Sequence, residues 1–446
     1  MVTQKAIFHT SSGDMDTSFG IGGIATIEVP GAFYSTVTGV INGQDDSLYV
    51  CGTADTETGS RFFITVLDSS GSINQDFGNK GFVIGTFGTY GATAEDSYAA
   101  QLVWANDEKL LLIGSSRIGL DIYPALAKFD QQGNIDPTFG ESGSGKVVVL
   151  LPGPPGTHFS SESDSEQKAV KSTIAPLKVG AASLLSDGKI LLSHYFFRGP
   201  APSYGMVIQL SSNGSLDTEF NATGYLAVMA PGYKSGQTQV TNVTIDSAGR
   251  YLVCGGVNRL DSSPLNSFIA RYTAQGVPDN TFGPDGFQIV FQDEVLPGGD
   301  RVEVMVPLDA GGVLGLGGSI YEPYVGQLLM LEENGQMNPD FNFGAPLNTR
   351  LGESGTLWKN CTYQPDGMLV VVGAIDKLVD SFDFDIVIAR FDKSGGLDSS
   401  FNSGLGWVRT RLGNEVAGAY TVLLQNNKIV VGGVSDSMGV VLRYQS

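Results

Sequence analysis

The chain has 446 residues, a formal net charge of −20, 41% apolar residues, and 60 Gly with 19 Pro. This apolar content can build a large core, and the acidic charge argues against nucleic acid or anionic membrane surfaces as partners, because both repel it. No apolar run approaches the ~18–20 residues of a membrane helix, and the opening MVTQKAIFHT lacks the apolar stretch of a secretory signal. We therefore expect no membrane insertion, and a chain that is cytoplasmic or exported without a signal.

One element recurs along the whole chain: Gly, two residues, Asp or Asn, two residues, Phe, and then Gly or Asn. We call it the signature, and it occupies residues 13–20, 71–78, 133–140, 214–221, 276–283, 335–342 and 395–402. Its phenylalanines lie 58 to 62 residues apart, except for one interval of 81. A period of this length indicates a repeat architecture built from one supersecondary unit.

Each period predicts four short strands. In chain order after the Phe they are a mixed run such as Gly81–Phe87, a run ending in a polar turn such as Ala182–Gly188, a dense apolar run such as Met368–Gly373, and a run such as Phe268–Tyr272. The Asp-Gly turns between them are typical of antiparallel hairpins. From the axis outward we expect the strand before the Asp-Gly turn first, the dense apolar strand second, the Phe268-type strand third and the mixed run outermost.

Seven such units predict an all-β fold, a seven-bladed β-propeller of four-stranded antiparallel blades, as a single domain over residues 1–446. A parallel β-helix is the rival architecture, but its coils are shorter than sixty residues and lack hairpin turns.

The closure of the ring follows from two paired positions of the repeat. Five residues before the signature Gly, copies two to seven have Val66, Lys128, Gln209, Arg271, Met330 and Arg390. Copies with Lys or Arg at this position have Asp in the signature, and the two copies with Val or Met have Asn. The copy with Gln keeps Asp. This pattern is typical of a partly buried ion pair, because a buried carboxylate without a partner is costly. Copy one has Asp16 without an upstream cation, and Arg443 near the C-terminus supplies one. We predict a three-plus-one closing blade that joins Val440–Ser446 to Ile24–Val29, with Arg443 bound to Asp16 and residues 1–10 elsewhere.

The L/I-D-x-x-F-G element at a period near sixty resembles the bacterial delta-60 repeat family, over essentially the whole chain. The resemblance implies a propeller and no common catalytic activity. Copies six and seven depart from the pattern, since Asn342 and Asn402 replace the final Gly.

Several motifs are better explained by structure than by chemistry. The signature Asp or Asn is expected to cap a turn while the Phe fills the gap between blades. The run Gly140–Lys146 resembles a phosphate-binding loop, but Val147 stands where Ser or Thr is needed and a strand follows. We expect Cys51, Cys254 and Cys361 to be buried thiols without disulfides.

The sequence also offers no recognisable catalytic or metal motif. His9, His158 and His194 form no metal-binding spacing, and no Gly-x-Ser-x-Gly elbow exists. The aspartates of Asp376–Asp385 do not match a calcium loop, so a solvated acidic loop is favoured over a cation site. We expect no catalytic residue, no metal and no cofactor.

The ligand surface is expected where connections vary. The long-loop face carries the connections between second and third strands and those between blades, including an insertion at about residues 151–176; the short-turn face carries the uniform turns and signatures. Candidate binding residues on the long-loop face are Arg117, Tyr123, Tyr195, Arg198, Tyr204, Arg259, Tyr321 and Tyr324. We expect a monomeric, non-enzymatic recognition or scaffold propeller that binds a protein or glycan there. The alternative is an enzyme, a hydrolase or lyase, with its site at the mouth of the axial channel.

Overall fold

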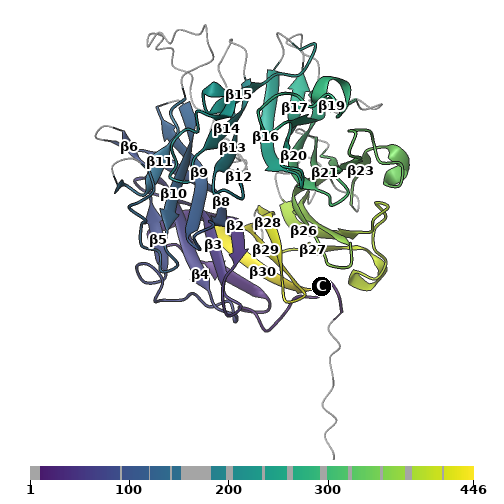
Figure 1. Cartoon of the computed structure of the whole chain (residues 1–446). Helices are drawn as coiled ribbons and strands as arrows, with labels where there is room; N and C mark the ends of the chain where they lie inside the picture. Colours follow the sequence, from purple (N-terminus) through teal and green to yellow (C-terminus); the bar gives the residue numbers. More distant parts are fainter. Residues whose placement is uncertain are drawn as a thin grey trace, which may run out of the picture.

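The computed structural model describes residues 11–90, 93–119, 121–140, 143–151, 182–196, 204–233, 237–258, 265–291, 299–319, 324–351, 355–376, 384–413 and 416–446. Within them the chain forms seven four-stranded antiparallel sheets arranged as blades around a ring (Figure 1). The predicted seven-bladed β-propeller is therefore confirmed.

Each blade has its strands in chain order from the inside outward, apart from the closing blade. Blade 1 comprises β28 (Ala417–Gln425), β29 (Lys428–Ser435), β30 (Met438–Gln445) and β1 (Ile24–Ile27). Blade 2 comprises β2 (Ala32–Asn42), β3 (Leu48–Thr56), β4 (Gly59–Leu67) and β5 (Phe82–Gly85). Blade 3 comprises β8 (Asp96–Trp104), β9 (Leu110–Ile118), β10 (Asp121–Phe129) and β11 (Lys146–Val148), after a small hairpin of β6 (Thr89–Tyr90) and β7 (Thr93–Ala94).

The remaining blades repeat this plan. Blade 4 comprises β12 (Ala182–Leu184), β13 (Ile190–Phe196), β14 (Tyr204–Leu210) and β15 (Tyr225–Val228). Blade 5 comprises β16 (Gln237–Ile245), β17 (Tyr251–Asn258), β18 (Asn266–Tyr272) and β19 (Phe287–Val290). Blade 6 comprises β20 (Asp300–Pro307), β21 (Val313–Ser319), β22 (Gly326–Leu331) and β23 (Leu347–Thr349). Blade 7 comprises β24 (Thr356–Tyr363), β25 (Leu369–Asp376), β26 (Phe384–Phe391) and β27 (Trp407–Thr410). Single 3-10 turns, η2 (Phe220–Ala222), η3 (Pro284–Gly286), η4 (Asn342–Gly344) and η5 (Asn402–Gly404), precede four outer strands, and no helix in these ranges could cross a membrane.

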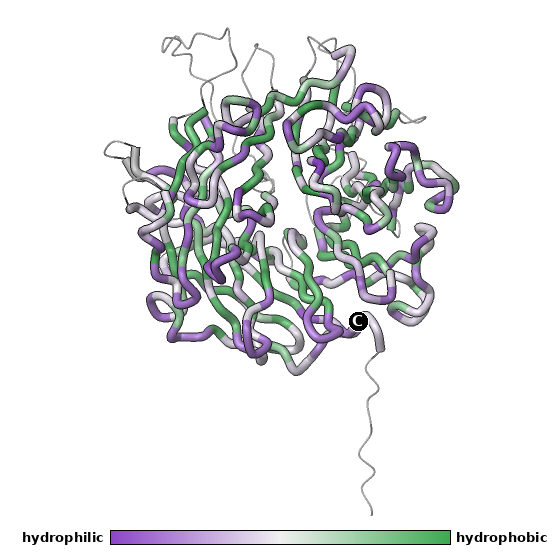
Figure 2. Tube along the Cα trace, viewed as in Figure 1, coloured by the Kyte–Doolittle hydropathy of each residue, from purple (hydrophilic) through white to green (hydrophobic). Residues whose placement is uncertain are grey.

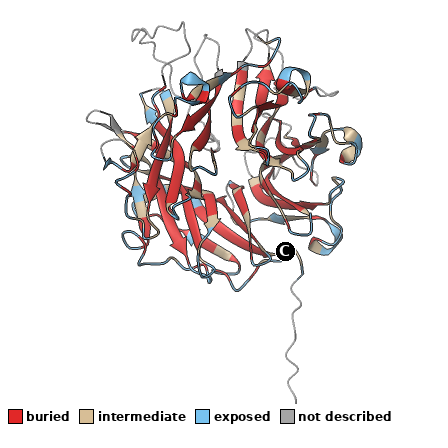
Figure 3. Cartoon of the chain, viewed as in Figure 1, coloured by how far each residue is buried: buried red, intermediate tan, exposed pale blue. Residues whose placement is uncertain are grey.

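The apolar runs lie where the blades face one another. The second strands are buried on both faces, as at Val370, Val371 and Val372, because neighbouring blades cover them. Apolar residues follow the middle of each blade and polar residues the connections (Figure 2), and burial follows the same pattern (Figure 3). The core is therefore a series of layers between adjacent blades.

The ring closes as the sequence predicts. β1 pairs antiparallel with β30, from Ile24 opposite Leu442 to Ile27 opposite Gly439. Arg443 Nε donates to Asp16 Oδ2 at 2.8 Å, and its guanidinium lies 4.5 Å from the centre of the Phe19 ring. Its Nη1 donates to the carbonyl of Ser69 in blade 2. The Arg443 side chain thus connects the C-terminal strand to the N-terminal signature and to blade 2.

The signature works as a turn cap and an inter-blade wedge. In all seven copies, Oδ1 of the Asp or Asn accepts the N–H two residues later, and each signature Phe is at most 3% exposed. Gly71, at φ 84°, packs so closely on Phe19 of the preceding blade that a Cβ would lie 3.0 Å from the ring. Asn342 and Asn402 adopt the same left-handed backbone as the Gly they replace, so their turns keep its shape. The capping role is confirmed.

The predicted ion pair between the third-strand cation and the signature Asp is present for the arginines, but not for Lys128 in blade 3. Arg271 binds Asp279 at 2.8 Å and Arg390 binds Asp398 at 2.6 Å, as predicted. Lys128, in contrast, binds Asp107 at 2.8 Å.

Asp136 is paired with Lys109, the residue just before the second strand. Burial raises the pKa of Asp136, but hydrogen bonds from Lys109 and Thr138 outweigh it and lower the pKa to about 2. The same position explains the Gln copy, because Lys189 binds Asp217 at 2.8 Å beside Gln209. Each blade therefore has two positions that can supply the cation, one on the third strand and one just before the second strand, and the prediction included only the first.

A cavity of about 400 Å³ lies beside Lys128, between blades 3 and 4. It is lined by Lys128, Phe139 and Ser212, and Ser212 corresponds to Ser69, whose carbonyl accepts from Arg443 in blade 1. The Lys128 ammonium is 5.9 Å from the Phe139 ring centre, compared with 4.5 Å for the Arg443 guanidinium over Phe19.

Lys128→Arg should therefore stabilise the ring by about 1 kcal/mol, because the larger planar cation can stack on Phe139 and reach the Ser212 carbonyl. Urea unfolding of both proteins measures this. An unchanged or lowered free energy of unfolding would show that the cavity is not an arginine-shaped space.

The three cysteines lie in the described ranges, buried on β3, β17 and β24, and are not joined by a disulfide. The insertion predicted at about residues 151–176 lies outside the described residues apart from Leu151, as do residues 1–10.

Candidate functional site

The two faces of the ring differ less simply than the sequence analysis expects. The connection between second and third strands is seven residues long in blades 4, 5 and 7, and six in blade 6. In blades 1, 2 and 3 it is only two residues, Asp436–Ser437, Glu57–Thr58 and 119–120. The expectation that this face carries long loops between second and third strands is therefore wrong for blades 1, 2 and 3, where the strands end close to the surface of the ring.

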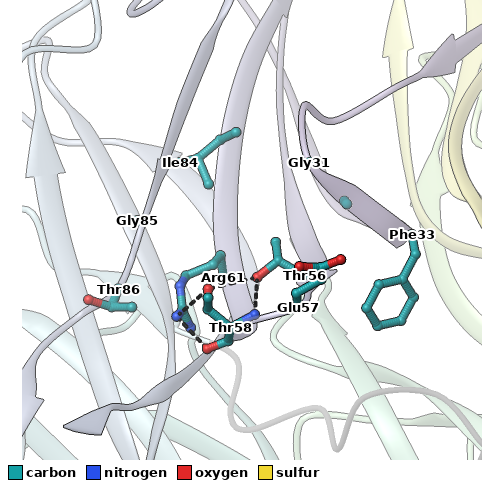
Figure 4. Close-up of a pocket in the computed structure, with 10 residues that line it drawn as sticks. Gly31, Phe33, Thr56, Glu57, Thr58, Arg61, Ile84, Gly85 and Thr86 are labelled. Carbon is teal, nitrogen blue, oxygen red and sulfur yellow. Dashed lines mark hydrogen bonds between the residues drawn. The ribbon is translucent and has the colours of Figure 1, made fainter.

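An open groove of about 800 Å³ lies on this face, over blade 2. Its lining comes from all four strands of the blade: Gly31, Ala32, Phe33, Thr56, Glu57, Thr58, Arg61, Ile84, Gly85 and Thr86 (Figure 4). In this view Arg61 lies between Thr86 on one side and Thr56 and Glu57 on the other, with Phe33 beyond them.

A β-bulge places the aromatic side chain of the groove. Ala32 pairs with Thr56 and Tyr34 pairs with Asp55, so Phe33 is an extra residue in β2. Bulges redirect a side chain and occur often near functional sites. The Phe33 side chain is 69% exposed, although an aromatic ring of this size is usually buried. The bulge thus presents an apolar ring face to solvent at the edge of the groove.

The tight turn between β3 and β4 supplies the polar wall. Thr56 Oγ1 donates to the Gly59 carbonyl at 2.8 Å, and the Thr58 N–H donates to Thr56 Oγ1. Gly59 has φ 111°, and a Cβ there would lie 2.6 Å from Asp96 Oδ1 of blade 3. Glycine is therefore needed for the turn to approach the neighbouring blade.

Arg61 is fixed by neutral acceptors. Its Nη1 donates to the carbonyls of Ser60 and Glu95 at 2.9 and 3.3 Å. Its Nη2 donates to the carbonyl and hydroxyl of Thr58 at 2.6 and 3.1 Å. These bonds hold the guanidinium in one place and join blade 2 to blade 3.

A polar cluster adjoins the groove at the junction with blade 3. Asp96 accepts from the Ser60 N–H at 2.9 Å, and its other oxygen lies 3.9 Å from Nη1 of Arg117. The Arg117 guanidinium stacks 5.7 Å from the Tyr98 ring centre. Burial and the nearby Asp96 carboxylate raise the pKa of Tyr98, so its hydroxyl remains protonated.

The structure brings one predicted residue, Arg117, next to the groove, through Asp96. Tyr123 lies on the adjacent strand, with its hydroxyl 3.4 Å from Asp121 Oδ2. Tyr195 lies on β13 in blade 4, and the Tyr324 ring lies 5.6 Å from Phe384 in blade 7. The other members of the set are Tyr204, at the start of β14 with its side chain not described, and Arg198, Arg259 and Tyr321, which lie outside the described residues.

The other motifs considered from sequence have structural roles where the structure describes them. Lys146, at the end of the apparent phosphate loop, begins β11 and donates to the Thr86 carbonyl at 2.7 Å. His194 is buried on β13, and burial lowers its pKa to about 3, so it is neutral.

The acidic segment Asp376–Asp385 is described only in part. Asp385 is fully buried and binds Nε of Arg409 at 2.7 Å, so the prediction of a solvated carboxylate is wrong for this residue. Asp380 and Asp383 lie outside the described residues, as do His9 and His158.

A family model described as a domain of unknown function (DUF5122) beta-propeller matches residues 364–401, which comprise most of one repeat in blade 7. This match supports a propeller repeat family. A search of curated proteins returns no match.

Among solved structures, the chain is similar to a puromycin hydrolase, with 11% identity, a TM-score of 0.47 and 96% of this chain aligned to 53% of that one. The chain thus spans about half the length of that protein. Sqt1 from Chaetomium thermophilum aligns with 12% identity and a TM-score of 0.48 over 94% of this chain and 100% of its own. The polysaccharide lyase Uly1 aligns with 8% identity and a TM-score of 0.47 over 99% and 94%. At these values the structural matches carry no argument about function.

Proposed function

We propose that this propeller is a recognition protein that binds a glycan on its long-loop face, in the groove over blade 2. The observation that carries the proposal is the bulge-borne Phe33, 69% exposed beside a row of hydrogen-bonding side chains. A solvent-exposed aromatic ring provides a flat surface on which a sugar ring can stack, and the hydroxyls of Thr56, Thr58 and Thr86 suit its hydroxyl groups.

A glycan fits the groove better than a protein surface for a second reason. Protein interfaces concentrate their affinity in an apolar core of large anchors. The groove instead combines one aromatic side chain, one partly exposed Ile84 and five polar or charged side chains. Its volume, about 800 Å³, lies within the range of small-molecule sites. The resemblance to delta-60 repeats is compatible with this proposal, because it implies no catalytic activity.

An enzyme with its site at the channel mouth remains the alternative, and it would need carboxylates able to exchange protons with a substrate. On the innermost strands β8 and β20, Asp96 lies 3.9 Å from Arg117, Glu303 binds Arg301 at 2.7 Å and Asp300 accepts from Ser267 at 2.7 Å. Carboxylates engaged in this way support recognition in preference to acid–base catalysis.

Phe33→Ala tests the proposed site. We expect the intact ring to bind a subset of a glycan array and Phe33→Ala to lose roughly three- to tenfold in affinity, since an aromatic stacking contact contributes about 0.5–1.5 kcal/mol. Phe343→Ala is the matched control, because Phe343 is 98% exposed on the signature turn of blade 6. Equal loss in both variants, or glycan binding unaffected by Phe33→Ala, would contradict the assignment to this groove.

A further inference from the structure

We propose that the glycan recognised in this groove carries a carboxylate, as a uronic acid does, and that Arg61 is the residue that selects it. This inference rests on the proposed function and adds the charge class of the ligand.

Arg61 differs from most other described arginines in its immediate surroundings. Eight other described arginines, among them Arg271, Arg390 and Arg443, have a carboxylate oxygen within 4.0 Å. Arg61 has four neutral oxygen partners instead, and no described carboxylate lies within that distance. In a chain of net charge −20, this position keeps a full positive charge without a carboxylate to neutralise it.

The charge is also held in a fixed place. Three backbone carbonyls and one hydroxyl occupy the two Nη atoms, which leaves the Nε–H as the remaining donor. Backbone acceptors keep the guanidinium rigid without removing its charge. A fixed cation in a partly desolvated groove attracts an anion more strongly than a mobile surface lysine does, because little ordering is needed on binding.

The rest of the lining indicates a sugar acid and not a simple anion. Glu57 lines the same groove and is not among the hydrogen-bond partners of Arg61. The groove therefore offers a carboxylate acceptor as well as a cation. A uronic acid has hydroxyl groups that can donate to Glu57 and a carboxylate that can lie at Arg61. Phe33 lies beyond Glu57 as seen from Arg61 (Figure 4) and offers its face to a neighbouring sugar ring of an oligomer, whereas inorganic phosphate would meet only Arg61.

The net charge sets a further expectation. A long polyanion is repelled by the protein as a whole, while a short oligomer within a Debye length of Arg61 is attracted locally. We therefore expect short uronate oligomers to bind better per residue than long chains.

The experiment compares oligogalacturonate with its methyl ester, which has the same ring and no charge, by calorimetry on the full chain. We expect the acid to bind roughly tenfold or more tightly than the ester, as a charge-assisted contact contributes ~1.5–3 kcal/mol. Arg61→Gln should abolish this preference, so that acid and ester bind with equal affinity. Arg350→Gln, which changes an exposed arginine on blade 6, should keep the preference.

The wild-type protein alone keeps the test decisive if Arg61→Gln folds poorly: the acid's affinity should fall with added NaCl while the ester's does not. Equal affinity of acid and ester in the wild type overturns the inference and leaves glycan recognition standing. Failure of both sugars to bind, or binding only of an acidic peptide, overturns the proposed function itself.

Discussion

Deletion of Val440–Ser446 should abolish cooperative folding of the ring. Val440, Val441, Leu442 and Tyr444 are each at most 3% exposed, and their strand β30 lies between β29 and β1. Removing four such side chains costs on the order of 10 kcal/mol, which is comparable to the whole stability of a typical domain. The N-terminal strand β1 would also lose its partner, so the closing blade would be reduced to two strands.

Urea unfolding followed by circular dichroism measures this effect. We expect the wild type to unfold in a single steep transition and the truncated chain to show none. Met438→Ala, which alters a 41% exposed side chain of the same strand, should unfold like the wild type. A truncated chain with a normal transition would mean that the ring does not depend on closure by β30.

Arg443→Val should destabilise the protein by about 3 kcal/mol, because it leaves Asp16 buried without its main cation. The side chains of Arg443 and Asp16 are 10% and 8% exposed. Burial raises the pKa of Asp16, but hydrogen bonds from Ser18 and the charge of Arg443 outweigh it and keep the pKa below its ordinary value. Lys428, at 3.9 Å from Asp16, limits the loss.

The double substitution Asp16→Asn with Arg443→Val provides the discriminating control. It recreates the pair found in blade 2, where Asn74 faces a third strand carrying Val66. We expect the double variant to be more stable than Arg443→Val alone, as measured by the free energy of unfolding. If the double variant is the less stable of the two, the loss comes from Arg443 stacking on Phe19 and not from the buried charge.

The architecture could be predicted from the sequence because each determinant is local and repeated. The signature, a tight turn before the second strand and the apolar second strand occur in every copy. The covariation of residues such as Arg390 with Asp398 identified the partner of Asp16. The prediction was wrong where a second element contributed, since Lys109 and Lys189 come from the turn before the second strand of the same blade. A single pair of positions could not represent a site that receives a cation from either the third strand or this turn.

The groove was harder to predict because it depends on two features that are specific to blade 2, a short turn and a β-bulge. The two-residue turn Glu57–Thr58 leaves space that longer connections could fill, and the bulge at Phe33 is one residue inserted in an otherwise regular strand. The candidate residues were chosen from the longer connections, and so they included residues in other blades, such as Tyr195 and Tyr324. The sequence feature that indicates the bulge is the run Ala-Phe-Tyr at 32–34. Its two adjacent aromatic residues do not fit the alternation of buried and exposed side chains along a strand.

Hydrogen–deuterium exchange of the intact protein, with and without a saturating oligogalacturonate, tests the central claim most directly, because it locates the ligand without any substitution. If the ligand binds in the groove over blade 2, we expect slower amide exchange in three segments that are distant in sequence: residues 31–34, 56–61 and 84–86. Protection confined to the short-turn face, for example at residues 105–109 and 186–189, would contradict it.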